Sequence, residues 1–331
     1  MTAQQTTPAQ QPMIAALERR YRDFFATRPA VPFAVAPAPG APAHSFGAGE
    51  PVFTITVRDG RGARALASLD QFGVAVAYLE GWLDVDGDLA AALRMRRFFR
   101  DIHPIAWLSR FAPALIQGRR EHDRRSISHH YDEDSEFFLT FLDTRHRCYT
   151  EGVFASDDEP LEDAMTRKMR LAVEALDLKP GDHVLEVGGG WGAFVEYAGK
   201  QGIEVTTTTL SVESERYLTA LIEREGLPAR VVRQHIFAYT APRRYDAIVN
   251  MGVTEHLPDY RTTLKKYAEL VKPGGGVYLD ALAMRAKHRV STFMSRYVYP
   301  GGSSPLLLHQ YLREVARSPF ELVSVADDRH N

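Results

Sequence analysis

The second half of the chain alternates short apolar runs with longer segments in which apolar residues recur at helical spacing. The short runs indicate strands, and the longer segments are typical of helices that bury one face. This alternation predicts an α/β fold built on a doubly wound parallel sheet with helices on both faces. The predicted strands cover residues 183–187, 204–208, 230–233, 247–251 and 276–281, and the predicted helices cover residues 162–175, 192–201, 214–225 and 262–270.

The first part of the chain has a different pattern, which predicts a small α+β domain. Residues 13–27 indicate a helix, and the Pro/Ala-rich stretch 29–42 is typical of an irregular connection. Apolar residues alternate with others over residues 51–59, the period of a strand, before a predicted turn at 60–62 and a helix-rich stretch over 66–93. We therefore predict three parts of the chain, namely a disordered tail at 1–12, the small domain at 13–115 and a larger domain at 116–331.

Composition and charge narrow the function classes. The formal net charge is −2, so we expect no nucleic-acid partner. The single cysteine, Cys148, excludes an internal disulfide and a cysteine-based zinc cluster, and it fits a reducing cytoplasm. No run approaches the ~18 apolar residues of a spanning helix, and the polar N-terminus lacks the features of a secretory signal. We expect a cytoplasmic protein, peripheral to the inner face of the membrane.

Arginines and aromatic residues cluster around the predicted domain boundary. One interpretation of the arginines is a solvated helix face, and the other is a patch for anionic lipid head groups, to which each basic residue adds ~1 kcal/mol. The aromatic residues fit lipid contact or an ordinary core, so both interpretations stay open. The arginines are Arg94, Arg96, Arg97, Arg100, Arg119, Arg120, Arg124 and Arg125, and the aromatic residues are Phe98, Phe99, Trp107 and Phe111.

A glycine-rich turn follows the first predicted strand of the larger domain. Glycines let the backbone approach a ligand closely, and the next helix offers N–H groups at its start. The turn lacks the G-x-G-x-x-G spacing of dinucleotide sites, and the acidic Glu186 before it suits the amino-acid portion of S-adenosylmethionine. A tight turn without a ligand is the structural alternative. The loop residues assigned to the cofactor are Gly188, Gly189, Gly190, Trp191 and Gly192.

The ends of the next two predicted strands carry polar residues at the same edge of the sheet, where open α/β sheets bind ligands. Thr209, Leu210 and Ser211 follow the second strand, where a ribose would be held. Gln234 and His235 follow the third strand and are placed for the adenine. For Thr209 and His235 an ordinary structural role fits equally well.

Four stretches carry a combined pattern that is far more specific than any one motif. They read SISHHYDEDSEFFLTFLD at 126–143, VLEVGGGWGAF at 184–194, MGVTEHLPDY at 251–260 and RYVYPGG at 296–302. With them the chain resembles the cyclopropane fatty acid synthase family, including its mycolic acid and branched-fatty-acid relatives. The segment YLEGWLDVDGDL at 78–89 is similar to the N-terminal domain of bacterial members.

The resemblance implies a Rossmann-like class I methyltransferase that uses S-adenosylmethionine and encloses a lipid tunnel, with a small lipid-associated N-terminal domain. It implies methyl transfer to the cis double bond of an unsaturated acyl chain in a phospholipid. The π bond is the nucleophile, so neither a metal nor an initial base is needed. The site must hold a cation away from water, and a base must then take a proton.

The resemblance also assigns residues outside the glycine loop. Tyr149 falls on a family tyrosine and is counted with both the cofactor and the catalytic residues, and Thr150 is counted with the cofactor. The aromatic residues among the substrate contacts fit a tunnel wall or plain core. The substrate contacts are His130, Tyr131, Phe137, Phe138, Phe141 and Tyr297.

The chain departs from cyclopropane-forming members at the catalytic positions. Glu151 stands at the family's cysteine and Asp280 at its histidine, whereas Glu255 and His256 keep the family's pair. In the family, the cysteine, glutamate and histidine positions surround a bicarbonate that serves as base. Three acidic groups would repel an anion, so we do not expect bicarbonate here, and Glu151 or Asp280 is expected to take the proton directly. A surface-loop role for Glu151 and a strand-end role for Asp280 are the structural alternatives.

The glutamate at position 151 resembles the methylene-forming branch, which installs a 10-methylene group on oleoyl chains on the way to 10-methylstearate (tuberculostearic acid). A flavin- or nicotinamide-dependent reductase partner would saturate the methylene group. Family members continue past the position of Asn331, so we expect a chain shortened at its C-terminus or a sheet completed differently.

Three alternatives stay open on this pattern. They are a cyclopropane synthase with a rearranged anion site, a small-molecule methyltransferase on the same fold, and a catalytically inactive lipid-binding relative. Because G-x-S-x-G and G-x-x-x-x-G-K-[ST] motifs are absent, a serine hydrolase and a P-loop nucleotidase are not expected. The sequence leaves the acyl chain, the head group and a homo-oligomeric state open.

Overall fold

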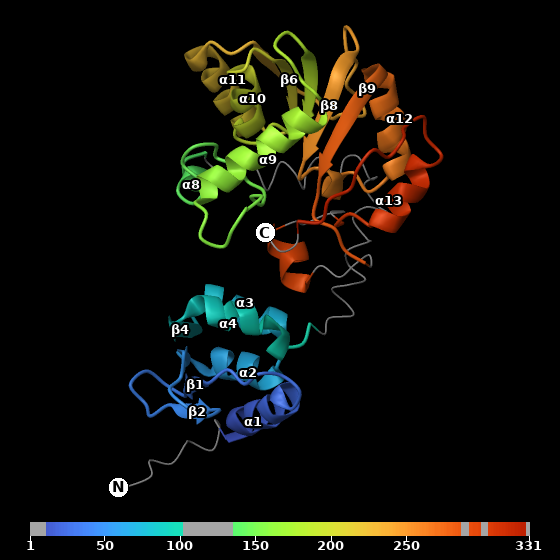
Figure 1. Ribbon diagram of the computed structural model, residues 1–331. Coiled ribbons are helices and arrows are strands. Elements are labelled where there is room, and N and C mark those ends of the chain that lie inside the picture. The colour runs from blue at the N-terminus through green and yellow to red at the C-terminus, as the bar shows by residue number, and fades with distance from the viewer. Residues whose placement is uncertain (1–10, 102–134, 286–290, 299–303, 329–331) are drawn as a thin grey trace. The chain divides into compact units, whose positions relative to one another are not determined.

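The computed structural model describes residues 11–101, 135–285, 291–298 and 304–328 (Figure 1). These residues form two compact units. The first contains residues 11–101 and 291–294, and the second contains residues 135–285, 295–298 and 304–328.

The first unit is a four-stranded sheet packed against helices. The strands lie in the order β2-β1-β3-β4, with β1 parallel to β3 and the other two neighbouring pairs antiparallel. Its elements are α1 (Gln11–Phe25), β1 (Phe33–Ala36), β2 (His44–Phe46), β3 (Phe53–Val57), α2 (Gly60–Ser68), α3 (Gln71–Leu79), β4 (Leu83–Gly87), α4 (Leu89–Arg94) and a 3-10 turn at Met95–Phe98.

Two expectations for this unit were wrong. The stretch 29–42 is not irregular throughout, because it contains the fully buried strand β1 between Pro32 and Pro37. The prolines flank the strand and interrupt no hydrogen bond within it, and burial on both faces removes the polar alternation that marks a strand. The expected turn at 60–62 is the first turn of α2, whose cap Asp59 accepts hydrogen bonds from the N–H groups of Arg61 and Gly62. The stretch 66–93 is helix-rich as expected, and it also contains β4.

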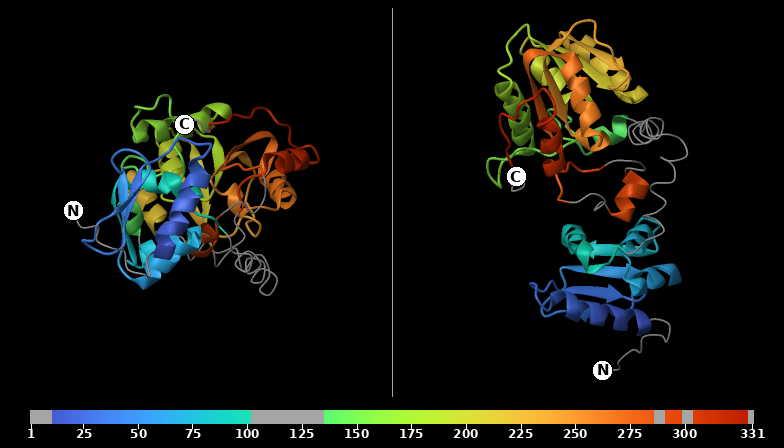
Figure 2. Two further views of the ribbon diagram at one scale, coloured as in Figure 1. Left: turned by 90° about the horizontal axis from the view of Figure 1, so that it is seen from below. Right: turned by 90° about the vertical axis from the view of Figure 1, so that its right-hand side faces the viewer.

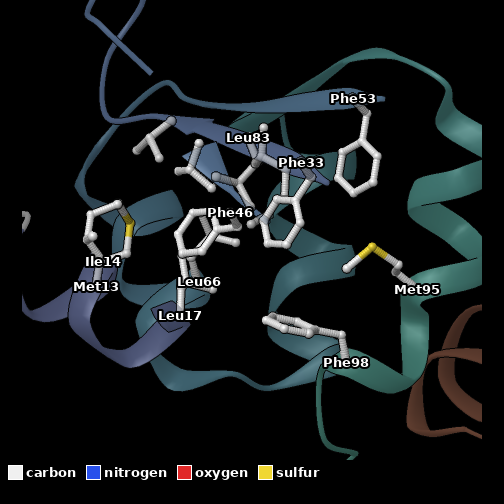
Figure 3. Close-up of a cluster of buried hydrophobic side chains, with 14 of the residues drawn as sticks. Met13, Ile14, Leu17, Phe33, Phe46, Phe53, Leu66, Leu83, Met95 and Phe98 are labelled. Atoms are coloured by element: carbon white, nitrogen blue, oxygen red, sulfur yellow. The ribbon is translucent and has the colours of Figure 1, made fainter. Parts of the chain in front are cut away.

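Stacked phenylalanine rings form the centre of this unit (Figure 3). The ring of Phe33 is stacked between those of Phe46 and Phe53, at centroid distances of 4.7 and 5.4 Å. Phe98 meets Phe33 edge-on at 5.7 Å and is fully buried, so it belongs to the core and is not a lipid contact.

We expect Phe33→Ala to lower the free energy of unfolding of this unit by about 3–5 kcal/mol, because it removes the central ring and leaves a cavity. Urea denaturation followed by circular dichroism would measure the loss. The matched control is Val52→Ala, whose side chain is 41% exposed, with an expected effect within about 0.5 kcal/mol. Equal effects of the two changes would contradict this account of the core.

The second unit contains five parallel strands, and it confirms the predicted α/β fold with a parallel sheet. Their order is β7-β6-β5-β8-β9. The chain therefore begins at the central strand β5, adds β6 and β7 on one side, and then crosses back to add β8 and β9 on the other side. The strands are β5 (His183–Val187), β6 (Glu204–Thr209), β7 (Ala229–Arg233), β8 (Tyr245–Met251) and β9 (Val271–Asp280).

Helices cover both faces of this sheet (Figure 2). A cluster of buried side chains packs against each face. Val184 packs with side chains of α9, α10 and α11 on one face, and its neighbour Leu185 packs with side chains of α12 on the other. The helices in the described part of the chain are all too short or too polar to cross a bilayer. The helices of this unit are α8 (Ser135–Leu139), α9 (Leu161–Ala175), α10 (Ala193–Gly199), α11 (Val212–Glu225), a 3-10 turn at Thr254–His256, α12 (Tyr260–Leu270), a π-helical turn reaching Val298 and α13 (Leu308–Val315).

Candidate active site

A cavity of about 130 Å³ opens at the carboxyl ends of the central strands. Parallel strands place the residues that follow them at one edge, and a change of strand order leaves a crevice there. Residues after β5, β6, β7 and β8 all reach this cavity, together with the segment 147–150. Of the predicted cofactor residues, those that line it are Tyr149, Thr150, Glu186, Gly188, Gly189, Gly190, Trp191, Thr209, Leu210, Gln234 and His235.

Two of the three consecutive glycines in the loop after β5, Gly188 and Gly189, have no room for a side chain. Gly188 has φ +86°, and a Cβ on it would lie 2.3 Å from Val253. A Cβ on Gly189 would lie 2.3 Å from Thr207 Oγ1, whereas a Cβ on Gly190 would meet open space. The loop therefore brings backbone to the cavity wall, as a ligand held by main-chain groups requires. Gly192 serves packing instead, since its Cβ would lie 2.4 Å from Leu221.

Glu186 is a buried carboxylate with an unsatisfied oxygen. Its side chain ends β5, lines the cavity and is 5% exposed. Its Oε2 makes no hydrogen bond of normal geometry within the described residues, although the nearby Thr207 hydroxyl partly counteracts the effect of burial on the pKa of Glu186. Burial raises the pKa of Glu186 to about 7. A ligand that offers a cation or hydrogen-bond donors would satisfy this carboxylate, and the ammonium of the amino-acid portion of S-adenosylmethionine fits that requirement.

Polar residues after β6 are divided between the cavity and the next helix. Thr209 and Leu210 line the cavity, but Ser211 caps α11 and accepts a hydrogen bond from the N–H of Ser214 at 3.1 Å. The hydroxyl of Ser214 donates to the carbonyl of Gly190 at 2.7 Å, which fixes the glycine loop. Ser214 also lines the cavity and was missed, because a serine in the first turn of a helix looks like ordinary capping.

Aromatic side chains close one side of the cavity. Trp191 is buried, and its ring lies 5.2 Å from that of Phe138. Phe138 also meets Tyr149 edge-on at 5.5 Å, and burial raises the pKa of Tyr149. Arg147, which also lines the cavity, pairs with Glu196 and was not predicted.

The predicted substrate contacts have different surroundings. Phe138 is 2% exposed, whereas Phe137, Phe141 and Tyr297 are 58%, 53% and 49% exposed. Phe138 thus belongs to the wall behind Trp191, and the other three present apolar surface. His130 and Tyr131 lie outside the described residues, as do Trp107, Phe111 and the arginines from 119 to 125.

Three carboxylates predicted from separate motifs share one region beside the cavity. The pKa of Glu255 is raised mainly by burial, and the negative charges of Asp280 and Glu151 raise it further. Its Oε1 accepts a hydrogen bond from the N–H of Leu282 at 2.6 Å, and its Oε2 is buried without a partner among the described residues. Two neighbours in sequence, Thr150 beside Glu151 and His256 beside Glu255, line the cavity.

A lysine that the sequence analysis missed accompanies these carboxylates. Lys168 on α9 is 1% exposed and forms an ion pair with Asp280. Its ammonium also donates to Thr150 Oγ1 and to the carbonyl of Glu151. The available signal was a lysine on the apolar face of a helix, four residues after Ala164 and four before Ala172.

Comparison with known proteins shows to which family the chain belongs. A family model described as mycolic acid cyclopropane synthetase matches residues 118–331. The chain belongs to the mycolic acid cyclopropane synthetase family. The resemblance in the four motifs is thereby confirmed. S-adenosylmethionine is the cofactor that this family and fold indicate, and the glycine loop and Glu186 fit it.

Several known proteins are similar to this chain. A probable fatty acid methyltransferase of Mycobacterium tuberculosis is 32% identical over 292 residues, 75% of this chain and 67% of that one. A tuberculostearic acid methyltransferase of the same organism is 29% identical over 209 residues, 59% of this chain and 49% of that one. The solved structure of a cyclopropane synthase of M. tuberculosis shares the fold, with a TM-score of 0.56 and 24% identity over 61% of this chain and 76% of that one.

Proposed function

We propose that the chain transfers a methyl group from S-adenosylmethionine to the cis double bond of an unsaturated fatty acyl chain in a phospholipid. The product would carry a 10-methylene branch, which a flavin- or nicotinamide-dependent reductase would saturate. The observation that carries this proposal is the group of three carboxylates beside the cofactor cavity. The names of the two mycobacterial relatives support a fatty acyl substrate.

When bound, S-adenosylmethionine supplies a methyl group on a positively charged sulfur. The chain's own residues must then hold the positive charge that the acyl chain acquires, exclude water and accept one proton. A hydride shift from the methyl-bearing carbon to the neighbouring cationic carbon moves the positive charge to the methyl-bearing carbon. Loss of a proton from the new methyl group then gives the methylene. Proton loss from that methyl group with ring closure would give a cyclopropane instead.

We assign the proton to Glu255. Its Oε2 is buried and has no hydrogen-bond partner in the part of the chain that the structure describes, and its raised pKa brings it closer to the neutral range in which a general base works best. Asp280 is engaged by Lys168, and Glu151 is exposed, so both are placed less favourably than Glu255. The negative charge of Glu151 would stabilise the cation on the acyl chain.

Contact with the membrane surface is part of the same proposal. In the first unit, Leu79 and Leu93 are 59% and 62% exposed, and the side chain of Arg94 is 71% exposed. Exposed apolar residues, one of them adjacent in sequence to an exposed arginine, suit shallow contact with anionic lipid head groups.

Lipid analysis tests the function. We expect cells that express the protein and are fed oleate to contain an acyl group with one additional carbon in total, carried as an exocyclic methylene branch. Mass spectrometry of the methyl esters before and after hydrogenation would detect it. Glu151→Gln is expected to lower the yield several-fold because the cation loses a nearby charge, and the exposed Glu269→Gln serves as control.

A cyclopropane as the main product would overturn the methylene proposal and favour the family's ring-forming reaction. The cells could instead show unchanged lipids while the purified protein binds S-adenosylmethionine. That result would overturn the proposal of an acyl substrate and favour a small-molecule methyltransferase or an inactive relative.

A further inference from the structure

Lys168 is an almost inaccessible charge on an otherwise apolar helix face. It is 1% exposed and shares its face of α9 with Ala164, Met165, Met169 and Ala172. A lysine is rarely buried this completely, because removing an ammonium from water costs several kcal/mol unless partners replace the water. The helix would gain stability from an apolar residue here, so the lysine calls for a reason other than packing.

The partners of Lys168 come from two other segments of the chain. Its ammonium pairs with the Asp280 carboxylate at the end of β9 and donates to Thr150 Oγ1 and, at 2.9 Å, to the carbonyl of Glu151. An ammonium has three donors, and each has an acceptor here. The side chain therefore ties α9, the segment 150–151 and the end of β9 to one point.

That point lies between the cofactor cavity and the carboxylates. Thr150 lines the cavity, and a Cβ on Gly252, which also lines it, would lie 2.4 Å from Thr150 Cγ2. The N–H of Gly252 donates to the carbonyl of Asp280 at 2.9 Å. A shift of Lys168 would thus disturb the cavity wall and the charge next to Glu255 together.

We infer that Lys168 is a positioning residue for methyl transfer: it offsets the charge of Asp280 beside Glu255 and holds the segment 150–151 against the cofactor cavity. This inference rests on the proposed function in that it assumes Glu255 as the proton acceptor. Without the ammonium, Asp280 and Glu151 would both oppose ionisation of Glu255. With it, three carboxylates can lie in one region while Glu255 still titrates.

The charges around Glu255 determine the sign of each expected change. Removing the Lys168 cation disfavours the ionised form of Glu255, which then titrates at higher pH. Removing the Asp280 anion favours the ionised form, which then titrates at lower pH. Removing both restores the original balance. Among the described residues, two carboxylates act on Glu255 directly, Asp280 and Glu151. The other titratable groups nearby are the adjacent His256, Lys168, which acts through Asp280, and Tyr278, which interacts with both Asp280 and Asp328.

The test compares the full-length protein with four variants, namely Lys168→Met, Asp280→Asn, the double variant and Lys168→Arg. Infrared spectra of protein labelled with 13C-glutamate, assigned by loss of the band in Glu255→Gln, would follow the protonation of Glu255 without any substrate. We expect opposite displacements of its titration in the two single variants, near-cancellation in the double variant, and little change in Lys168→Arg. Binding of S-adenosylmethionine is expected to weaken about tenfold in Lys168→Met, because Thr150 loses its donor.

Single variants that shift the titration in the same direction, or leave it unmoved, would overturn the inference and leave Lys168 a structural residue. If Lys168→Met alone does not fold, Asp280→Asn and the double variant decide by the same comparison. The opposite displacements together with unchanged lipids would mean that the proposed substrate is wrong while the role of Lys168 stands. Formation of the lipid product without these displacements would mean that the proposed substrate is right and that Lys168 does not have the proposed role.

Discussion

Replacing Glu186 with glutamine is expected to weaken the binding of S-adenosylmethionine about 10- to 100-fold. The substitution keeps the size of the side chain but removes the charge that holds a cation in the cavity, and a hydrogen bond to a charged group contributes about 1.5–3 kcal/mol. Isothermal titration calorimetry with S-adenosylmethionine would measure the change. Glu269→Gln removes an exposed glutamate from α12 and is the matched control.

In Glu186→Gln, the affinity for S-adenosylmethionine should no longer depend on pH in the way that it does in the wild type. In the ligand-free protein the pKa of Glu186 is raised to about 7 by burial, so below that pH the side chain must release a proton before it can hold a cation. Affinity in the wild type is therefore expected to rise between pH 6 and 8, and that rise is expected to be absent in Glu186→Gln. An equal rise in both proteins would assign the pH dependence to another group.

The stability of the ligand-free wild type should fall as pH rises, whereas its affinity for the cofactor should increase. The folded-state pKa of Glu186 lies above its ordinary value of 4.5, so the stabilising contribution of this group is complete below 4.5 and is lost as pH rises to about 7. At pH 8 the buried carboxylate is charged and destabilises the fold. Ligand-free Glu186→Gln is expected to unfold at a temperature a few degrees higher than the wild type at pH 8, and to gain less from added cofactor. A variant that is less stable at pH 8 would show that Glu186 has a structural partner.

The parallel sheet was predictable because each strand is a short apolar run between helical segments. β5 has the predicted bounds, and β6 and β7 differ by one residue each. β9 begins five residues before the predicted start, because Lys272–Gly275 looks like a turn. There the strand has a register shift opposite β8, and Gly275 lies so close to Asp246 that a Cβ would be 2.4 Å from its carbonyl oxygen. Local composition indicated a turn, and pairing with β8 outweighed it.

Some features of the site depend on local sequence and could be predicted, and others depend on contacts between distant segments and could not. The glycine loop and the polar residues after β6 and β7 follow from position at strand ends, so the cavity lining was largely predictable. The partners of Lys168, and the burial of Glu186 and Glu255 oxygens that have no partner within the described ranges, depend on segments far apart in the chain. No spacing in the sequence encodes such contacts, so the apolar helix face around Lys168 indicates its burial but not its partners.

We expect Glu255→Gln to lower the rate of product formation by about 10²- to 10⁴-fold, the usual contribution of a positioned general base. The amide can still accept the hydrogen bond from the N–H of Leu282, so the turn at Thr254–His256 should keep its conformation. Glu255 does not line the cofactor cavity, and binding of S-adenosylmethionine should stay within about twofold of the wild type. Single-turnover assays with radiolabelled methyl donor and oleoyl phospholipid vesicles would measure the rate.

Comparison with Glu151→Gln decides which carboxylate accepts the proton. Glu151 is exposed and contributes a charge, so its loss should slow the reaction several-fold, whereas loss of the acceptor should nearly stop it. If Glu151→Gln proved far slower than Glu255→Gln, the proton would belong to Glu151 and the buried oxygen of Glu255 would only shape the charge around the acyl chain. If both variants were slowed to the same extent and the double variant no further, the two carboxylates would act as one unit that shares the proton.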